Sequence, residues 1–128
     1  MSDEGPTIKR RMQPGFIVVS TDAALAEELR SEAGEDWRML VVNGIDEAGD
    51  WSDVLLYRFI IMDLENGPPD PPEEIRRIRQ ELMINTPVFG VGGSDDIRGR
   101  ARQEGGDRFF DRDQARAHLP DLLAAFGW

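Results

Sequence analysis

The residue with the clearest chemical potential is Asp63, which ends the apolar run FIIM and precedes the loop LENGPPDPP. A carboxylate at the end of a buried strand can ligate a cation or act as a nucleophile. Polar or small residues also follow the other apolar runs of the chain. They are Ser20, Thr21 and Asp22 after the first run, Gly92, Gly93 and Ser94 after the fourth, and the segment 111–113 after the fifth. Whether Asp63 is reactive depends on which of these groups the fold brings to it.

Strands and helices alternate in the pattern that would position these groups. Apolar runs at 16–19, 59–62 and within 37–44, 86–94 and 107–113 predict five strands. Five helical segments separate or follow them, which requires a parallel sheet covered on both faces. The predicted fold class is therefore a doubly wound, five-stranded, flavodoxin-like (βα)5 sandwich. Its ligand crevice should lie at the carboxyl ends of the strands, where the polar residues gather.

The helices carry more specific expectations. The first should be capped at residues 20–22 and end at Gly34, and the third should begin after Asp70. The segment 45–58 is predicted to be a weak helix, and 95–106 a poor one because it contains Gly99 and few apolar anchors. Pro120 should bend or restart the last helix. Two inner faces are predicted: Ala48, Trp51 and Leu55 on the second helix, and Ile75, Ile78, Leu82 and Met83 on the third, with Arg76, Arg77 and Arg79 pointing elsewhere.

Composition and charge restrict the classes of function. The net charge of −10 opposes binding to nucleic acid, and the basic islands 9–11 and 98–102 are interpreted as solvated surface. The chain has no Cys, no apolar core of a secretory signal and no apolar run long enough to span a bilayer. We expect a cytoplasmic protein without a membrane partner, with a flexible tail at 1–15 and one domain at 16–128.

Over residues 16–126 the chain resembles the receiver domain of bacterial response regulators. The resemblance rests on the order of elements, on Asp63 after the third strand, on TPVFGV with Pro87, and on EGGDRFFDR before the last helix. It implies that Asp63 occupies the position of the phosphoacceptor that takes a phosphoryl group from a histidine kinase. Receiver chemistry also needs an acidic pair for Mg²⁺, a Ser or Thr after the fourth strand and a Lys after the fifth.

Those supporting residues are replaced in this chain. By the resemblance the acidic pair aligns with Ser20 and Thr21, the hydroxyl with Gly92 and the lysine with Arg112, while Phe109 takes the place of the aromatic switch residue. Arg for Lys is not a conservative exchange for a compact ammonium. The pattern is similar to an atypical receiver, or pseudo-receiver, in which Asp63 is a leftover carboxylate paired with Arg112.

The resulting hypothesis is a stand-alone, receiver-like module that signals through protein contact, without enzyme activity or cofactor. Its partner would be a histidine kinase, a downstream regulator or a second copy, bound through the region 95–106, the fifth strand and the last helix. One alternative is a functional single-domain response regulator phosphorylated on Asp63, with Mg²⁺ held by Asp22, Asp63 and Glu65 and with Ser94 supplying the hydroxyl. The other is a flavodoxin-like binder of a small ligand or nucleotide.

Three further motifs are interpreted as structural. GVGGSDD should be a tight turn before a helix, since it lacks the Lys and the spacing of a phosphate-binding loop. His118, the single histidine, is expected on a helix surface. Trp37, Trp51 and Trp128 are expected to anchor the core or its boundary, with an exposed contact as the alternative for Trp128.

Overall fold

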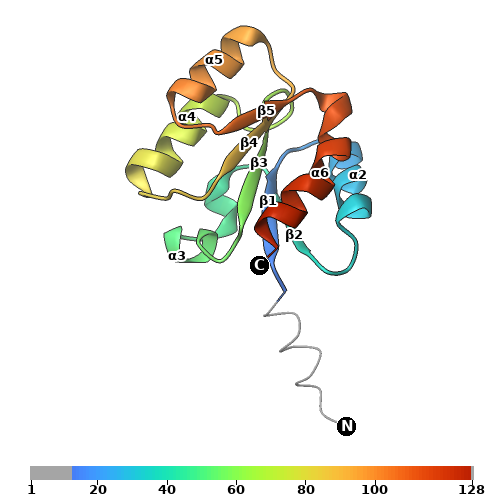
Figure 1. Ribbon diagram of the computed structural model, residues 1–128. Coiled ribbons are helices and arrows are strands. Elements are labelled where there is room, and N and C mark those ends of the chain that lie inside the picture. Colours follow the sequence, from blue (N-terminus) through green and yellow to red (C-terminus); the bar gives the residue numbers. More distant parts are fainter. Residues whose placement is uncertain (1–12, 128) are drawn as a thin grey trace.

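Five parallel strands form the central sheet of the computed structural model, which describes residues 13–127 (Figure 1). The order across the sheet is β2-β1-β3-β4-β5, so the chain adds strands first to one side of β1 and then to the other. This is the doubly wound arrangement that the sequence predicts. The strands are β1 (Gly15–Val19), β2 (Arg38–Val42), β3 (Phe59–Asp63), β4 (Val88–Val91) and β5 (Arg108–Phe110).

Helices cover both faces of the sheet. On one face α2 (Ala23–Ala33) lies beside α6 (Arg112–Phe126). The other face is covered by the short helix η1 (Ile45–Ala48), by α3 (Trp51–Val54), by α4 (Pro71–Arg76) with its wider, π-helical continuation η2 (Arg77–Glu81), and by α5 (Asp95–Gln103). Within residues 13–127 no helix has the length and apolar character needed to cross a membrane.

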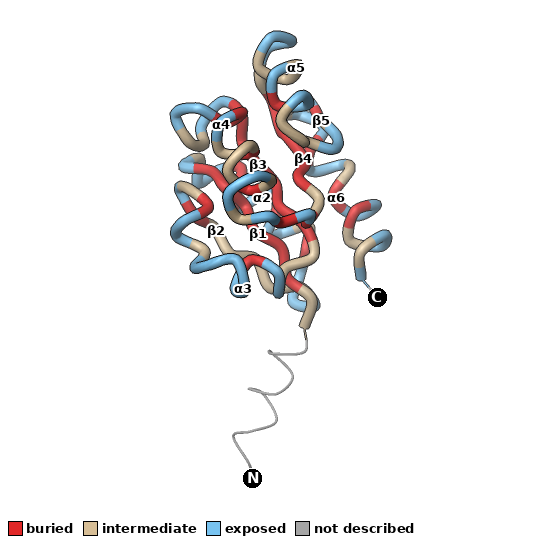
Figure 2. Tube along the Cα trace, turned by 90° about the vertical axis from the view of Figure 1, so that its left-hand side faces the viewer, coloured by how far each residue is buried: buried red, intermediate tan, exposed pale blue. Residues whose placement is uncertain are grey.

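Each strand contributes to two separate cores because successive side chains point to opposite faces. In β1, Phe16 and Val18 face α2 and α6, whereas Ile17 and Val19 face the helices on the other side. All four are fully buried. Figure 2 shows the strands as an almost continuous buried layer between helices whose outer surfaces are exposed. The uninterrupted apolar runs in the sequence follow from this double coverage.

An aromatic hub occupies the core under α2 and α6. The Phe59 ring stacks on Phe16 at a centroid distance of 4.9 Å and lies 5.8 Å from Trp37. Phe89 and Phe126 each lie 5.7 Å from the same ring. The hub joins three strands, the residue before β2 and the end of α6. Trp37 is therefore a boundary anchor of the core, as predicted.

The folded unit begins before the predicted boundary at residue 16. Gln13 donates a hydrogen bond from its side chain to the carbonyl of Glu35, at 2.7 Å. The Pro14 carbonyl accepts a hydrogen bond from the Arg38 N–H at 2.9 Å, and Gly15 is the first residue of β1. Residues 13–15 are therefore part of the folded domain, and not of the predicted tail. The rest of the predicted tail, 1–12, and the predicted anchor Trp128 lie outside the described residues.

The predicted inner face of the second helix is wrong. Trp51 and Leu55 are 56% and 51% exposed, and the buried side chains are Ile45 and Val54. The cause is Gly49, whose positive φ of 109° interrupts the segment, so that η1 and α3 are separate short helices. A single helical period over the whole segment therefore assigns the wrong face.

The third helix begins at the predicted cap, Asp70, and buries Ile75 and Ile78. Met83 does not extend this face: it is 76% exposed and has a positive φ of 56°. The widening of the helix at η2 changes the angular position of the residues that follow, which a constant period of 3.6 does not anticipate. Leu82 is partly buried against the same core, so the predicted inner face is correct for Ile75, Ile78 and Leu82 and wrong for Met83.

Arg79 contradicts the expectation that this helix's arginines point away from the core. Its guanidinium donates hydrogen bonds to the carbonyls of Ile84 and Thr86, both at 2.8 Å, and to that of Gly105 at 3.0 Å. It also pairs with Asp107 at 3.0 Å. Arg79 therefore holds the segment before β4 to the segment before β5.

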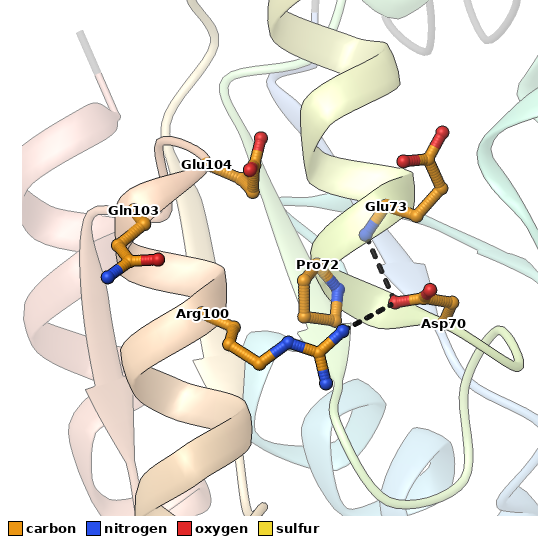
Figure 3. Close-up of a pocket in the computed structure, with 6 residues that line it drawn as sticks. All are labelled: Asp70, Pro72, Glu73, Arg100, Gln103 and Glu104. Atoms are coloured by element: carbon orange, nitrogen blue, oxygen red, sulfur yellow. Dashed lines mark hydrogen bonds and ion pairs between the residues drawn. The ribbon is translucent and has the colours of Figure 1, made fainter.

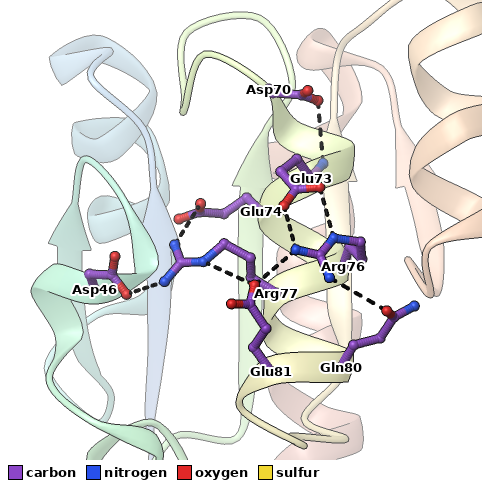
Figure 4. Close-up of polar contacts among 8 residues, drawn as sticks. All are labelled: Asp46, Asp70, Glu73, Glu74, Arg76, Arg77, Gln80 and Glu81. Atoms are coloured by element: carbon purple, nitrogen blue, oxygen red, sulfur yellow. Dashed lines mark hydrogen bonds and ion pairs between the residues drawn. The ribbon is translucent and has the colours of Figure 1, made fainter.

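The other two arginines do lie on the surface, in the ion-pair network of Figure 4. Arg76 pairs with Glu73 at 2.6 Å and with Glu81 at 2.9 Å. Arg77 reaches Asp46 at 2.8 Å and thereby links η2 to η1. Such exposed pairs contribute little individually.

The helix α5 is better formed than predicted. It extends over nine residues, and the Ser94 hydroxyl caps it by accepting a hydrogen bond from the Ile97 N–H at 3.2 Å. Acidic residues fill the first turn and Arg100 and Arg102 the last, which complements the helix dipole. Capping and charge placement offset the small apolar face, of which only Ala101 is buried. The last helix, α6, continues through Pro120 without a break.

Candidate functional site

Asp63 lies at the carboxyl end of β3, where its side chain is buried and fully engaged. Only 1% of the residue is exposed. One carboxylate oxygen, Oδ1, accepts hydrogen bonds from the N–H groups of Glu65 (2.9 Å) and Asn66 (3.0 Å). The other, Oδ2, accepts one from the Ser20 hydroxyl at 2.8 Å. The carboxylate therefore holds the loop after β3 and connects it to the end of β1.

Ser20 takes part in two hydrogen bonds at this position. Besides donating to Asp63, its Oγ accepts a hydrogen bond from the Asp22 N–H at 3.0 Å. The residue is 2% exposed. A hydroxyl can donate and accept at once, whereas a carboxylate at this position would face the Asp63 carboxylate without a proton to share. Ser20 can therefore donate to the buried Asp63 carboxyl group, which an aspartate carboxylate at this position could not do.

Arg112, the first residue of α6, supplies a positive charge beside Asp63. Its Nη2 donates to Asp22 Oδ2, and its Nη1 lies 4.0 Å from Asp63 Oδ2. Asp22 also caps α2 by accepting hydrogen bonds at Oδ1 from the N–H groups of Ala24 and Leu25. The predicted approach of Arg112 to Asp63 is present, but the closer partner of Arg112 is Asp22. Within residues 13–127, Nη1 is buried and has no hydrogen-bond partner.

Thr21 fastens the loop after β3 from the other side. Its N–H and its hydroxyl both donate to the Asn66 carbonyl, at 2.6 and 2.8 Å. The Asn66 N–H is in turn bound by Asp63. The loop is therefore held at one residue by groups from β1 and β3. Asn66 was not singled out from the sequence, because nothing in its residue type indicates that its backbone is the contact point.

Glu65 points to the loop after β4. Its Oε2 accepts a hydrogen bond from the Gly93 N–H at 2.9 Å. Gly92, at the predicted position of the receiver hydroxyl, has a positive φ of 74°, and a Cβ there would lie 2.7 Å from the Glu65 carboxyl carbon. Because the Gly92 N–H binds the Phe110 carbonyl, both glycine N–H groups are engaged within the protein. This supports the interpretation of GVGGSDD as a structural turn.

The side chains around Asp63 do not fit the magnesium site of receiver chemistry. Asp22 is bound to Arg112, Glu65 to the loop after β4, and Asp63 to Ser20 and two N–H groups. Among the described residues, no three His, Cys, Asp or Glu side chains gather where they could hold a metal ion. A guanidinium already lies between two of the three candidate ligands. Ser94, the proposed substitute hydroxyl, caps α5 instead.

Arg98 is a residue of the crevice that the sequence does not reveal, since it belongs to a basic island interpreted as solvated surface. Its guanidinium binds the carbonyls of Gly92 (2.8 Å) and Phe110 (3.0 Å), as well as Asp111 at 3.0 Å. It therefore joins the ends of β4 and β5.

Phe109 lies in β5 and packs against the edge of the core on the α5 side of the sheet. The ring is half-buried, and the Arg102 guanidinium lies 4.8 Å from its centre. A Cβ on Gly90 would lie 2.6 Å from this ring, so the glycine makes room for it. His118 is not simply a surface residue as predicted: it is half-buried and stacks on Phe110 at 4.7 Å.

Two small hollows adjoin these groups. Figure 3 shows the first, about 140 Å³ between α4 and α5, where Arg100 reaches across to Asp70 at 3.8 Å. The second, about 340 Å³, lies beside the crevice and is lined by Ser20, Thr21, Asp22, Ala23, Ala26, Glu27, Arg30, Val41 and Asn43.

Solved structures with the same architecture are response regulator receiver domains. One from Bermanella marisrubri is 24% identical, with a TM-score of 0.67 over 88% of this chain and 96% of that one. The receiver domain of a sensor histidine kinase from Pseudomonas aeruginosa PAO1, which holds a magnesium ion in its active-site cleft, is 20% identical (TM-score 0.66, 88% and 96% covered). A phosphorylated cyanobacterial phytochrome response regulator is 14% identical (TM-score 0.71, 89% and 94% covered). No protein-family model matches the chain, and no curated protein matches it by sequence. The chain thus has the receiver fold within the flavodoxin-like class.

Proposed function

We propose that this chain is a receiver-like signalling module that works by protein contact and does not depend on phosphorylation of Asp63. The observation that carries the proposal is the position of Arg112, whose guanidinium lies between Asp22 and Asp63. The similarity to receiver domains in fold, together with the replacement of the residues around Asp63, supports the signalling class.

Phosphoryl transfer makes two demands that argue against Asp63 as an acceptor. The accepting oxygen must be reachable by the donor, and a divalent cation must neutralise the charge of the transferred group. Asp63 is 1% exposed, and Oδ2 faces Ser20 and Arg112. Arg112 cannot replace the divalent cation. Its guanidinium carries a single charge and is already bound to Asp22, and it cannot coordinate phosphoryl oxygens as a metal ion does.

The contact surface in this proposal is formed by α5, β5 and α6. This surface includes the edge strand β5, Phe109 with Arg102 above its ring, and the small hollow beside Arg100. The partner is a histidine kinase or a downstream regulator. We expect binding to it to be the same for the wild type and for Asp63→Asn.

The decisive experiment is incubation with acetyl phosphate and Mg²⁺, followed by intact-mass measurement. The wild type should gain no phosphoryl group. A mass gain that Asp63→Asn abolishes would instead establish the alternative, a functional single-domain response regulator. The triple variant Ser20→Asp, Thr21→Asp, Arg112→Lys restores the receiver pattern. Phosphorylation of this variant alone would attribute the lost reaction to these positions and not to the fold.

A small-ligand function is the second candidate, because the hollow of about 340 Å³ beside the crevice is lined by hydroxyl, amide, carboxylate and guanidinium groups together with apolar side chains. A nucleotide that raises the melting temperature, without any effect of Mg²⁺ and phosphodonor, would favour it. The matched control is Arg30→Gln, which removes the positive charge from the lining of this hollow. If the same nucleotide stabilises Arg30→Gln equally, the hollow is not its site.

A further inference from the structure

Large exposed apolar side chains are concentrated in one short stretch of the molecule. Among the described residues four such side chains are exposed, and three of them are Trp51, Leu55 and Leu56, with exposed fractions of 56%, 51% and 67%. Trp51 and Leu55 are four residues apart and are joined by a backbone hydrogen bond of 3.1 Å, so they lie on the same side of α3. The anchors of this region are the buried Ile45 and Val54, which leaves the other three free for another contact.

Four exposed carboxylates lie close to these apolar side chains in the sequence. Asp46, Glu47, Asp50 and Asp53 lie within the same eleven residues, 46–56, and are exposed. The Ser52 hydroxyl and the Asp53 N–H donate to Asp50 and lower the pKa of its carboxyl, so Asp50 is ionised at neutral pH. Within residues 13–127, Asp46 pairs with Arg77, whereas no ion pair joins the other three to a cation. We call these four carboxylates and three apolar side chains the α3 surface.

We propose that the α3 surface binds a basic amphipathic helix of a partner protein. Exposed aromatic and aliphatic side chains that lie together mark interaction sites, and Trp is among the residue types that most often carry binding energy. Trp51 and Leu55, which are exposed one turn apart, provide a short apolar strip on which the apolar face of an amphipathic helix can pack. The surrounding carboxylates select lysine or arginine side chains on the partner and disfavour acidic ones.

The α3 surface is distinct from the crevice and from the surface of α5, β5 and α6. Two residues after Leu56, the Arg58 N–H binds the Gly15 carbonyl at 2.7 Å, at the amino-terminal edge of the sheet. Asp63 ends its strand at the opposite edge, and Figure 1 shows α3 far from α5 and β5. The inference therefore holds whether or not Asp63 is phosphorylated.

A second copy of the chain is a poorer occupant. A twofold contact through the α3 surface would place its carboxylates against the same carboxylates of the other copy. Like charges in such a contact disfavour association. A basic helix removes this repulsion and covers the same apolar groups.

The test uses a fluorescently labelled, amphipathic lysine-leucine helix as the probe and fluorescence anisotropy as the readout. We expect Trp51→Ser with Leu55→Ser to weaken binding by about tenfold or more, as for a contact centred on these side chains. Met83→Ser is the matched control, because Met83 is the fourth exposed large apolar side chain and is 76% exposed. Equal binding by the wild type and the double variant would overturn the proposal.

The charge requirement has its own controls. Glu47→Gln with Asp53→Asn should weaken binding and reduce its salt dependence, whereas Glu27→Gln with Glu28→Gln on α2 removes the same charge elsewhere and should not. Equal effects of the two pairs, or equal binding of a glutamate-leucine helix, would contradict the proposal. Self-association in sedimentation that Leu55→Ser abolishes would also contradict the proposal.

The basic segment 9–11 of the same chain is another possible occupant of the α3 surface. If a chain beginning at residue 13 binds the probe at least about tenfold more tightly than the full chain, this segment is the occupant and the proposal fails.

Discussion

Arg112 Nη1 lies 4.0 Å from Asp63 Oδ2 while Nη2 of the same guanidinium binds Asp22, so one side chain from α6 compensates two carboxylates, one at the end of β3 and one at the N-cap of α2. The crevice therefore carries its own cation. A divalent ion at this position would have to displace a covalently tethered charge before it could coordinate either carboxylate.

If Arg112 and a divalent ion compete for the carboxylates of Asp22 and Asp63, removing Arg112 should allow the ion to bind. The wild type is expected to show no change in melting temperature with millimolar Mg²⁺ or Mn²⁺, whereas Arg112→Ala should gain about 1 kcal/mol when the ion is several-fold above its dissociation constant. Arg116→Ala is the control, since Arg116 pairs with Glu32 away from the crevice. Stabilisation of the wild type by as much as the variant would show that Arg112 does not exclude the ion.

Ser20→Ala should be costly for so small a change. It removes the donor to Asp63 Oδ2 and the acceptor for the Asp22 N–H, both at a position that is 2% exposed. A buried group that loses its partner costs about 1–3 kcal/mol. Urea unfolding measures the loss, with Ser52→Ala as the exposed control. Equal losses for the two serines would show that the buried bond has no special weight.

Gly99→Ala should stabilise the protein. Gly99 lies inside α5, and a Cβ there would meet nothing within 4 Å. Alanine in a helix interior is favoured over glycine by about 0.5–1 kcal/mol. Thermal unfolding should show a higher melting temperature, and an unchanged or lower one would contradict the helical assignment.

Gly90→Ala should have the opposite effect, because its Cβ would lie 2.6 Å from the Phe109 ring. Crowding of this kind costs about 1–3 kcal/mol. In a double-mutant cycle, Phe109→Ala should remove most of that added cost. Simple additivity of the two losses would show that Phe109 is not the obstacle.

Arg79→Met tests the buried guanidinium. It leaves the carbonyls of Ile84, Thr86 and Gly105 without their donor, and we expect a loss of about 2–4 kcal/mol in the free energy of unfolding. Arg76→Met, which breaks only exposed pairs, should cost much less. Similar losses at the two positions would contradict the structural role assigned to Arg79.

The strands were predictable because helices cover both faces of the sheet, so that β1, β3 and β4 are buried over their whole length and consist almost entirely of apolar residues. The helices were less so, since their inner faces depend on local backbone events. Gly49 divides the segment after β2 into two short helices, and the π-helical turn at Arg77–Glu81 redirects Arg79 and Met83. Neither change of register follows from residue type alone.

The sequence also brought Ser20, Asp63 and Arg112 to one edge of the sheet correctly. It did not identify Asp22 as the closer partner of Arg112, nor the Asn66 carbonyl as the acceptor for Thr21. Both contacts depend on the conformation of the loops that follow the strands. Several polar groups lie close together there, and the periodicity of the sequence does not indicate which of them will form a hydrogen bond.

Two of the three tryptophans of the chain, Trp37 in the aromatic hub and Trp51 on the α3 surface, have different surroundings and can report on them by fluorescence. Trp37 lies 6.0 Å from Phe16 and 5.8 Å from Phe59, whereas Trp51 is mostly in water on the opposite face of the sheet. Emission from Trp37 should shift to the red only when the hub opens, while Trp51 should be quenched by acrylamide in the native state. With Trp51→Phe and Trp128→Phe, Trp37 is the one tryptophan left in the chain, so the loss of tertiary packing under α2 and α6 can be followed without a signal from the α3 surface.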